Sequence, residues 1–228
     1  DFSGYTDIAI GIALLLGFSF PQNFDSPYAA TSVQDFWRRW HMTLSRFLRD
    51  YVYIPLGGNR KGSVITYRNL MLTMLIGGLW HGAGWTFVVW GGSHGVGLTM
   101  EHWRKNRAGY VARADTRRRR IVSRLITFNI VCVAWVFFRA DSFATAWDML
   151  LGLFTGWGEA SPLVTAGVLL AIAVGIGSQY LPARFPYAVM DRFGRLPVVG
   201  QAVVLAVALM LTSTMGPEGV APFIYFQF

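Results

Sequence analysis

Cysteine is almost missing from this 228-residue sequence, because Cys132 is its only example and lies within an apolar run. A disulfide framework and a cysteine-based zinc site are therefore excluded. Charge is also scarce: Asp, Glu, Lys and Arg make up 14% of the residues, against about 25% in an ordinary soluble domain. Hydrophobic residues reach 54%. This combination argues against a water-soluble domain and indicates a protein that lies in a membrane.

The few charges are unevenly distributed along the chain. Lys and Arg total 20 against 12 acidic residues, which gives a net charge of +8. Such a balance is also typical of nucleic-acid binding, but short cytoplasmic loops of membrane proteins collect Lys and Arg. One basic stretch holds nearly half of the Lys and Arg residues, and we therefore predict that it is a cytoplasmic loop between two spans. No nucleic-acid partner is expected. The basic residues of this stretch are Arg104, Lys105, Arg107, Arg113, Arg117, Arg118, Arg119, Arg120 and Arg124.

Six apolar runs have the composition of membrane spans, each of which needs about 20 apolar residues. Between the first two runs, residues 33–52 carry aromatic side chains at helical spacing with arginines between them. This pattern predicts an amphipathic helix at the cytoplasmic interface. Residues 139–162 and 182–195 are predicted to be connecting loops. The expected fold is an all-α, polytopic transmembrane helix bundle in a single domain, 1–228. Its apolar runs are 8–20 (extended backward to residue 5), 64–80, 83–100, 121–138, 163–180 and 196–212.

Histidine occurs four times, and its positions are the first candidates for chemistry. His81 follows a spanning run and is flanked by small residues and tryptophans, so its imidazole is a candidate general base near neutral pH. A histidine that merely packs between helices is the alternative. His41 lies among arginines, where an interfacial role is the simpler interpretation. The spacings of His81, His94 and His102 match no helical zinc pair, so no metal site is predicted.

The sequence GGSHG at residues 91–95 formally matches the G-x-S-x-G pattern of esterases. That pattern works where a strand turns sharply into a helix, whereas this stretch lies in an apolar run. Gly91 and Gly95 are therefore predicted to form a close-packing helix face, rather than to present Ser93 as a nucleophile.

Several segments are more specific than composition requires. They are DFSGYTD at residues 1–7, PQNFDSPY at 21–28, FWRRWHMTLS at 36–45, RDYVYIPLGG at 49–58, GLWHG at 78–82 and PFIYF at 222–226. Together they resemble the membrane-bound O-acyltransferase (MBOAT) family, and within it the bacterial alginate O-acetyltransferase-like branch. Complete members of that family have further spans upstream, and this sequence begins with Asp1 rather than Met. We therefore expect it to be the C-terminal portion of a larger enzyme whose N-terminal spans are missing.

The resemblance implies an enzyme that moves an acyl group from a thioester donor to a hydroxyl, through a tunnel that crosses the membrane. It implies that His81 corresponds to the catalytic histidine of the family and His41 to its second functional polar position. The residues expected to shape the tunnel are Trp80, Trp85 and Trp90. Those expected to hold the anionic arm of the donor are Arg38, Arg39 and Arg49.

The charge distribution places His41 on the cytoplasmic side and His81 toward the outside, as transfer from an inside donor to an outside acceptor needs. No bound cofactor is expected; the co-substrate is an acyl thioester, acyl-CoA or an acyl carrier, with acetyl as the expected acyl group. The expected surroundings are the lipid of a bacterial cytoplasmic (inner) membrane, an extracytoplasmic acetyltransferase-type partner protein and a polysaccharide acceptor, as in alginate biosynthesis. A polytopic transporter or flippase-like protein without acyl transfer is the alternative, and it does not account for the two histidine segments together.

Overall fold

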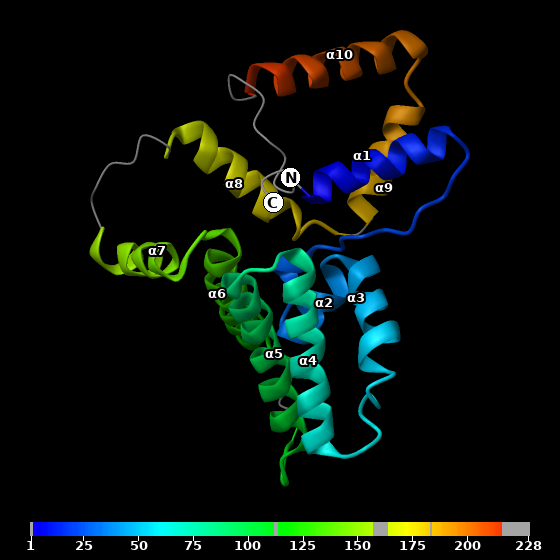
Figure 1. Cartoon of the computed structure of the whole chain (residues 1–228). Coiled ribbons are helices and arrows are strands. Elements are labelled where there is room, and N and C mark those ends of the chain that lie inside the picture. Colours follow the sequence, from blue (N-terminus) through cyan, green and yellow to red (C-terminus); the bar gives the residue numbers. More distant parts are fainter. Residues whose placement is uncertain (1, 112–113, 157–163, 183, 216–228) are drawn as a thin grey trace. The chain divides into compact units, whose positions relative to one another are not determined.

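The computed structural model describes residues 2–111, 114–156, 164–182 and 184–215, and the regular structure in these ranges is helical (Figure 1). The chain divides into two compact units, Phe2–Gln179 and Tyr180–Phe228. The second unit contains α9 (Arg184–Gly194) and α10 (Val198–Met215). The first unit contains α1 (Phe2–Leu15), η1 (Pro27–Ala29), α2 (Val33–Arg39), α3 (Met42–Leu48), η2 (Arg49–Tyr53), α4 (Ser63–His81), α5 (Trp85–Asn106), α6 (Arg117–Arg139), α7 (Phe143–Thr155) and α8 (Ala166–Ser178).

The six predicted apolar runs are confirmed as helices, namely α1, α4, α5, α6, α8 and α10. The two predicted loops are wrong, because each contains a helix, α7 or α9. Helix α7 begins at a local signal that the length of an apolar run does not reveal. The Ser142 side chain accepts a hydrogen bond from the backbone N–H of Thr145, as an N-cap does. Among the described helices, α6 is the one that is long and apolar enough to span a membrane.

Helices α4 and α5 form an antiparallel pair that glycines allow to approach closely (Figure 1). A Cβ atom on Gly78 would lie 2.3 Å from the Phe87 carbonyl oxygen, and one on Gly91 would lie 2.3 Å from the Met74 carbonyl oxygen. A Cβ on Gly95 would lie 2.8 Å from the Met71 sulfur. The predicted packing role of Gly91 and Gly95 is therefore confirmed. Helix α6 packs on the other side of α5.

The predicted continuous helix over residues 33–52 is wrong, because the segment breaks at Trp40 and His41 into α2 and α3. Helix α2 runs along α5, with Val33 against Gly97 and Trp37 against Trp90. Helix α3 and the π-helical turn η2 then return along α4, where Leu48 contacts Gly77. We call residues 33–58 the hairpin. Because both of its arms bury side chains against α4 and α5, its register is set by packing and not by its own amphipathic pattern.

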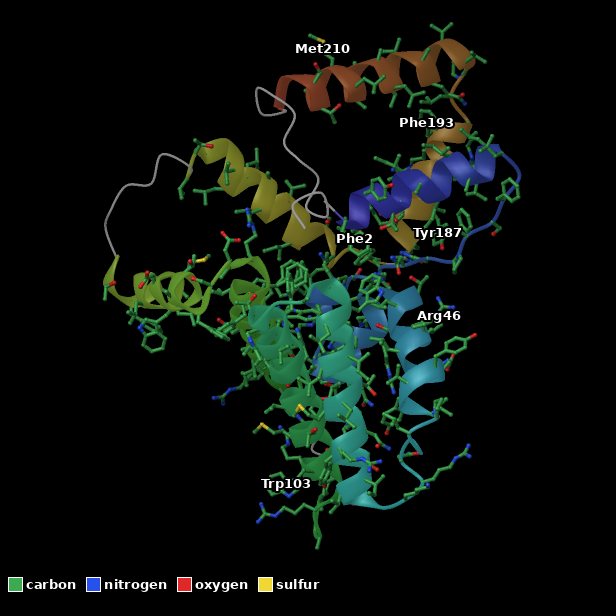
Figure 2. All side chains as sticks on the ribbon, viewed as in Figure 1. Phe2, Arg46, Trp103, Tyr187, Phe193 and Met210 are labelled. Atoms are coloured by element: carbon green, nitrogen blue, oxygen red, sulfur yellow. The ribbon has the colours of Figure 1, made fainter. Side chains whose placement is uncertain are left out.

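Helices α8 and α10 present a different surface. No described side chain of either helix is buried, and most of their leucines, valines and methionines are largely exposed. Met210, for example, projects freely from α10 (Figure 2). These helices are apolar all round, as is typical of segments whose surroundings are not water.

Candidate active site

The structure brings the two predicted site histidines together. Helix α4 ends at His81, and His41 lies in the turn of the hairpin. Both imidazoles face the Trp80 ring, with centroids 6.3 Å apart for His41 and 4.9 Å for His81, and they are close enough to interact electrostatically. Their predicted placement on opposite sides of the membrane is wrong, because a hydrocarbon core is about 30 Å thick. The hairpin is the reason, since it carries His41 to the end of α4.

The turn at His41 is held by Asn23, from the segment before η1. Trp40 is extended and His41 has a φ of 42°, a left-handed conformation that residues other than glycine seldom adopt. The Asn23 carbonyl accepts a hydrogen bond from the Met42 N–H at 2.9 Å, and the Asn23 Oδ1 accepts one from the Thr43 N–H at 3.1 Å. These two bonds hold a backbone conformation that the local sequence does not favour.

His41 is surrounded by aromatic rings and is half-buried. The Phe2 ring meets its imidazole edge to face at 4.8 Å, and the Phe24 ring is stacked at 6.4 Å. Burial lowers the pKa of His41 from 6.5 to about 4. The imidazole is therefore neutral at pH 7, which a proton acceptor requires.

His81 is enclosed by three aromatic rings. Trp80, Trp90 and Phe138 meet its imidazole nearly edge to face, with centroids 4.9 to 5.1 Å away. Trp80 and Trp90, two of the residues expected to shape the tunnel, thus lie against His81. Trp85 does not join them: it is 75% exposed, and none of the ring contacts of the described residues links it to His41 or His81. Phe138 was missed, because it lies far along the chain in α6.

His94 lies one helical turn after Trp90 and is fully buried. Its ring stacks on Phe36 at 6.0 Å and meets Trp37 and Trp90 edge to face at 5.2 Å. Neither ring nitrogen has a hydrogen-bond partner among the described residues. His94 therefore belongs to the aromatic core that joins the hairpin to α5.

A cavity of about 490 Å³ lies between the hairpin, α4 and α5. Three arginines line it, Arg38, Arg46 and Arg49, together with Trp37 and both apolar and uncharged polar side chains. Two of the predicted donor-arm residues, Arg38 and Arg49, are therefore at one cavity. Arg46 was missed, although it lies on the same arm as Arg49.

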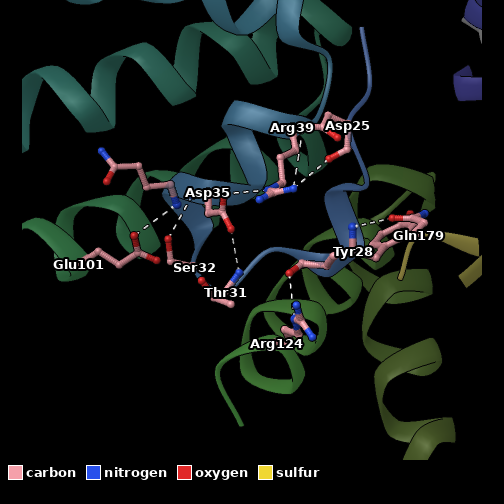
Figure 3. A network of polar contacts seen from close by, with 11 residues as sticks. Asp25, Tyr28, Thr31, Ser32, Asp35, Arg39, Glu101, Arg124 and Gln179 are labelled. Atoms are coloured by element: carbon pink, nitrogen blue, oxygen red, sulfur yellow. Dashed lines mark hydrogen bonds and ion pairs between the residues drawn. The ribbon is translucent and has the colours of Figure 1, made fainter. Parts of the chain in front are cut away.

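Arg39 is not among the residues that line the cavity. Its guanidinium pairs with Asp35 at 2.8 Å and lies 4.0 Å from Asp25, within the polar network of Figure 3. The direction of a side chain on a helix decides this difference, because adjacent residues point about 100° apart. The sequence did not separate Arg38 from Arg39.

The same network fixes the start of α2 (Figure 3). The Glu101 carboxylate accepts hydrogen bonds from the backbone N–H groups of Val33 and Gln34, and the Ser32 Oγ accepts one from the N–H of Asp35. The first three N–H groups of α2 are thereby satisfied by side chains. An acidic group at this end also complements the helix dipole, so α5 holds the hairpin in place.

The basic ends of three helices lie together. Helix α4 begins two residues after Lys61, and α6 begins at Arg117. Helix α5 carries Arg104 and Lys105 in its last turn. Because α5 runs antiparallel to α4, and Phe138 at the far end of α6 meets His81, the histidines lie at the opposite end of this group. The cavity lies between the two ends, alongside the middle of α4.

An aromatic-walled histidine pair beside an arginine-lined cavity suits acyl transfer from an anionic donor. Residues 1–147 match the family model "MBOAT, membrane-bound O-acyltransferase family". The chain belongs to this family, and is therefore part of a helical membrane protein.

Relatives in the same family act on bacterial polymers, as their names state. The chain is 54% identical over 153 residues to the peptidoglycan O-acetyltransferase of Helicobacter pylori, an alignment that covers 67% of this chain and 28% of that protein. It is 38% identical over 266 residues to the probable alginate O-acetylase AlgI of Azotobacter vinelandii, covering 100% of this chain and 52% of that protein. It is 30% identical over 154 residues to the teichoic acid D-alanyltransferase of Bacillus subtilis, covering 63% and 38%. The chain thus spans about half the length of these relatives, or less.

Proposed function

We propose that this chain carries the reacting histidines of a multi-pass bacterial membrane enzyme that transfers an acetyl group from a thioester donor to a hydroxyl of an exported polysaccharide. The observation that supports this most is the meeting of His41 and His81 on the ring of Trp80. The names of the relatives favour acetyl over other acyl groups and a cell-surface polymer over other acceptors.

In this mechanism His81 acts as the general base. It takes the proton of the acceptor hydroxyl while that oxygen attacks the thioester carbonyl. The carbonyl carbon then forms its new bond to oxygen, and the bond to sulfur breaks. The donor leaves as a thiolate and takes up the proton that His81 received, so that the imidazole is neutral again. A covalent acyl-imidazole on His81 is the variant mechanism.

The arginine-lined cavity is proposed to hold the anionic arm of the donor, which is acyl-CoA or an acyl carrier. Arg38, Arg46 and Arg49 supply guanidinium groups, which bind phosphate well because they are planar and permanently charged. The basic helix ends lie on the cytoplasmic side by the positive-inside rule. The donor therefore enters from the cytoplasm, and the acetyl group leaves for an extracytoplasmic partner protein or for the polymer itself.

The test is His81→Ala in the full-length protein, with acetylation of the polymer measured by release of labelled acetate. Loss of acetylation, with the protein still inserted in the membrane, is expected. The matched control is His102→Ala, because His102 lies near the other end of α5, against Tyr67. Unchanged acetylation in His81→Ala would refute the proposal. Polymer export lost together with acetylation would favour a transporter instead.

A further inference from the structure

The side chain of Asn23 is the centre of a small hydrogen-bond cluster at His41. Asn23 is 5% exposed. Its Oδ1 lies 3.1 Å from the backbone nitrogen of Thr43, 2.9 Å from the Thr43 Oγ1 and 3.2 Å from the His41 Nδ1. Three polar groups from the turn of the hairpin thus converge on one oxygen atom.

The chemistry of these groups fixes where the proton of His41 resides. A backbone N–H can only donate, so the Asn23 atom that faces Thr43 is the oxygen and not the amide nitrogen. An amide oxygen can only accept. The Thr43 hydroxyl also lies 3.4 Å from His41 Nδ1, but it donates its one proton to the nearer Asn23 Oδ1 at 2.9 Å and supplies none to Nδ1. A His41 Nδ1 without a proton would place its lone pair against the Asn23 oxygen, which is repulsive. Nδ1 therefore carries the proton, and in the neutral ring Nε2 carries the free lone pair.

We propose that Asn23 is a positioning residue that holds His41 in the Nδ1–H tautomer, so that His41 serves acyl transfer only as a hydrogen-bond acceptor through Nε2. This inference rests on the proposed function for its role in the reaction, but not for the tautomer itself. The proposal assigns different roles to the two histidines. His81 takes and returns the proton of the reaction, whereas His41 orients a group that donates a hydrogen bond to its Nε2 and releases no proton itself.

The first experiment reads the tautomer directly and needs no activity. The full-length protein, labelled with nitrogen-15 at histidine and held in lipid nanodiscs at pH 7, gives different nitrogen chemical shifts for protonated and unprotonated ring nitrogens. The His41 signals are identified by their absence from His41→Gln. A protonated Nδ1 and an unprotonated Nε2 are expected. A protonated Nε2, or a doubly protonated ring, would overturn the proposal whatever the enzyme transfers.

The second experiment compares variants of the acceptor oxygen. Asn23→Leu removes it, and we expect kcat to fall by roughly 100-fold, since a misplaced tautomer removes the acceptor from the site. Asn23→Asp keeps an oxygen in place and is expected to restore most of this loss and the Nδ1–H signal. Gln22→Leu is the matched control, because the Gln22 amide donates to the Phe24 carbonyl oxygen at 2.7 Å, next to Asn23 in the chain, but takes no part in the cluster at His41.

The control also separates positioning from folding. Gln22→Leu is expected to lower the melting temperature slightly while the tautomer and kcat stay unchanged. If Asn23→Leu kept the Nδ1–H tautomer, or if Asn23→Asp failed to restore it, Asn23 would not be the positioning residue. Failure of the proposed function is recognised separately. In that case the His41 nitrogen spectrum would be as expected, but the full-length protein would transfer no acetyl group.

Discussion

The α4–α5 pair and helices α8 and α10 all come from apolar runs of the sequence, yet they differ in what they bury. The pair buries glycines, threonines, Asn69 and His94 together with Met74, Phe87 and Trp90, and turns many of its other large apolar side chains outward. Helices α8 and α10 bury no described side chain. The family match, residues 1–147, includes the pair and stops before α8.

The difference shows what apolar sequence can and cannot specify. In a lipid environment an outward leucine gains nothing by moving inward, so helices associate through close backbone contact and buried hydrogen bonds. The pair has both features, and the candidate active site is built on it. Apolarity alone, as in α8 and α10, specifies a helix but no particular neighbour.

The largest effect is expected for Gly91→Ala. The new Cβ would lie 2.3 Å from the carbonyl oxygen of Met74, a backbone atom that cannot move without displacing α4. We expect a loss of about 3 kcal/mol in the free energy of unfolding, measured by unfolding of the purified protein in detergent. The matched control is Gly175→Ala on α8, where a Cβ has no neighbour within 4 Å. Equal losses in both variants would contradict the comparison.

A smaller loss is expected for Asn69→Leu. The fully buried Asn69 amide donates to the carbonyl oxygens of Leu56 at 3.2 Å and Gly58 at 2.9 Å, and so joins α4 to the end of the hairpin. Leaving these carbonyls unpaired is expected to cost about 2 kcal/mol. Thr212→Val on α10 is the control, since the Thr212 hydroxyl bonds to carbonyls of its own helix. A change of less than about 0.5 kcal/mol is expected there.

Glu101→Ala tests how α5 holds the start of α2. Two backbone N–H groups lose a charged acceptor, which is expected to cost about 1.5 kcal/mol. Lys105→Ala removes an exposed bond to Gln34 one turn further along α5 and is expected to have little effect. Hydrogen exchange of the α2 amides is the measurement; protection that is unchanged in Glu101→Ala would show that the hairpin is held by its aromatic contacts alone.

The smallest effect is a dependence of stability on pH. The pKa of His41 is lowered to about 4 in the folded protein by burial, against 6.5 in an unfolded chain. Between these values the unfolded state binds more protons, so stability falls as the pH drops from 6.5 to 4. His41 is only half-buried and solvent screens it, so about 1 kcal/mol is expected. His41→Gln should flatten the melting temperature over this range; an unchanged slope would refute the assignment to His41.

How far the sequence predicted the site differs between its residues. Local segments that are distinctive by themselves singled out His41, His81 and Trp80, which the structure brings together, and Arg38 and Arg49, which line one cavity. Phe138 and Asn23 were not found, because their roles arise from contacts with residues far away in the chain. Arg39 and Trp85 were included wrongly as members of the site, since neither a pattern nor a resemblance tells which way a side chain on a helix points.

The sequence by itself determined the apolar helices, the basic ends of three of them and the segments that carry the candidate site residues, because composition and periodicity are local properties of a chain. Only the tertiary structure decided that the hairpin folds back along α4 and α5 and brings His41 to His81. That decision depends on glycines that let two backbones touch, on Glu101 at the start of α2 and on Asn23 at the turn. Each of these acts through a neighbour that is distant in the chain.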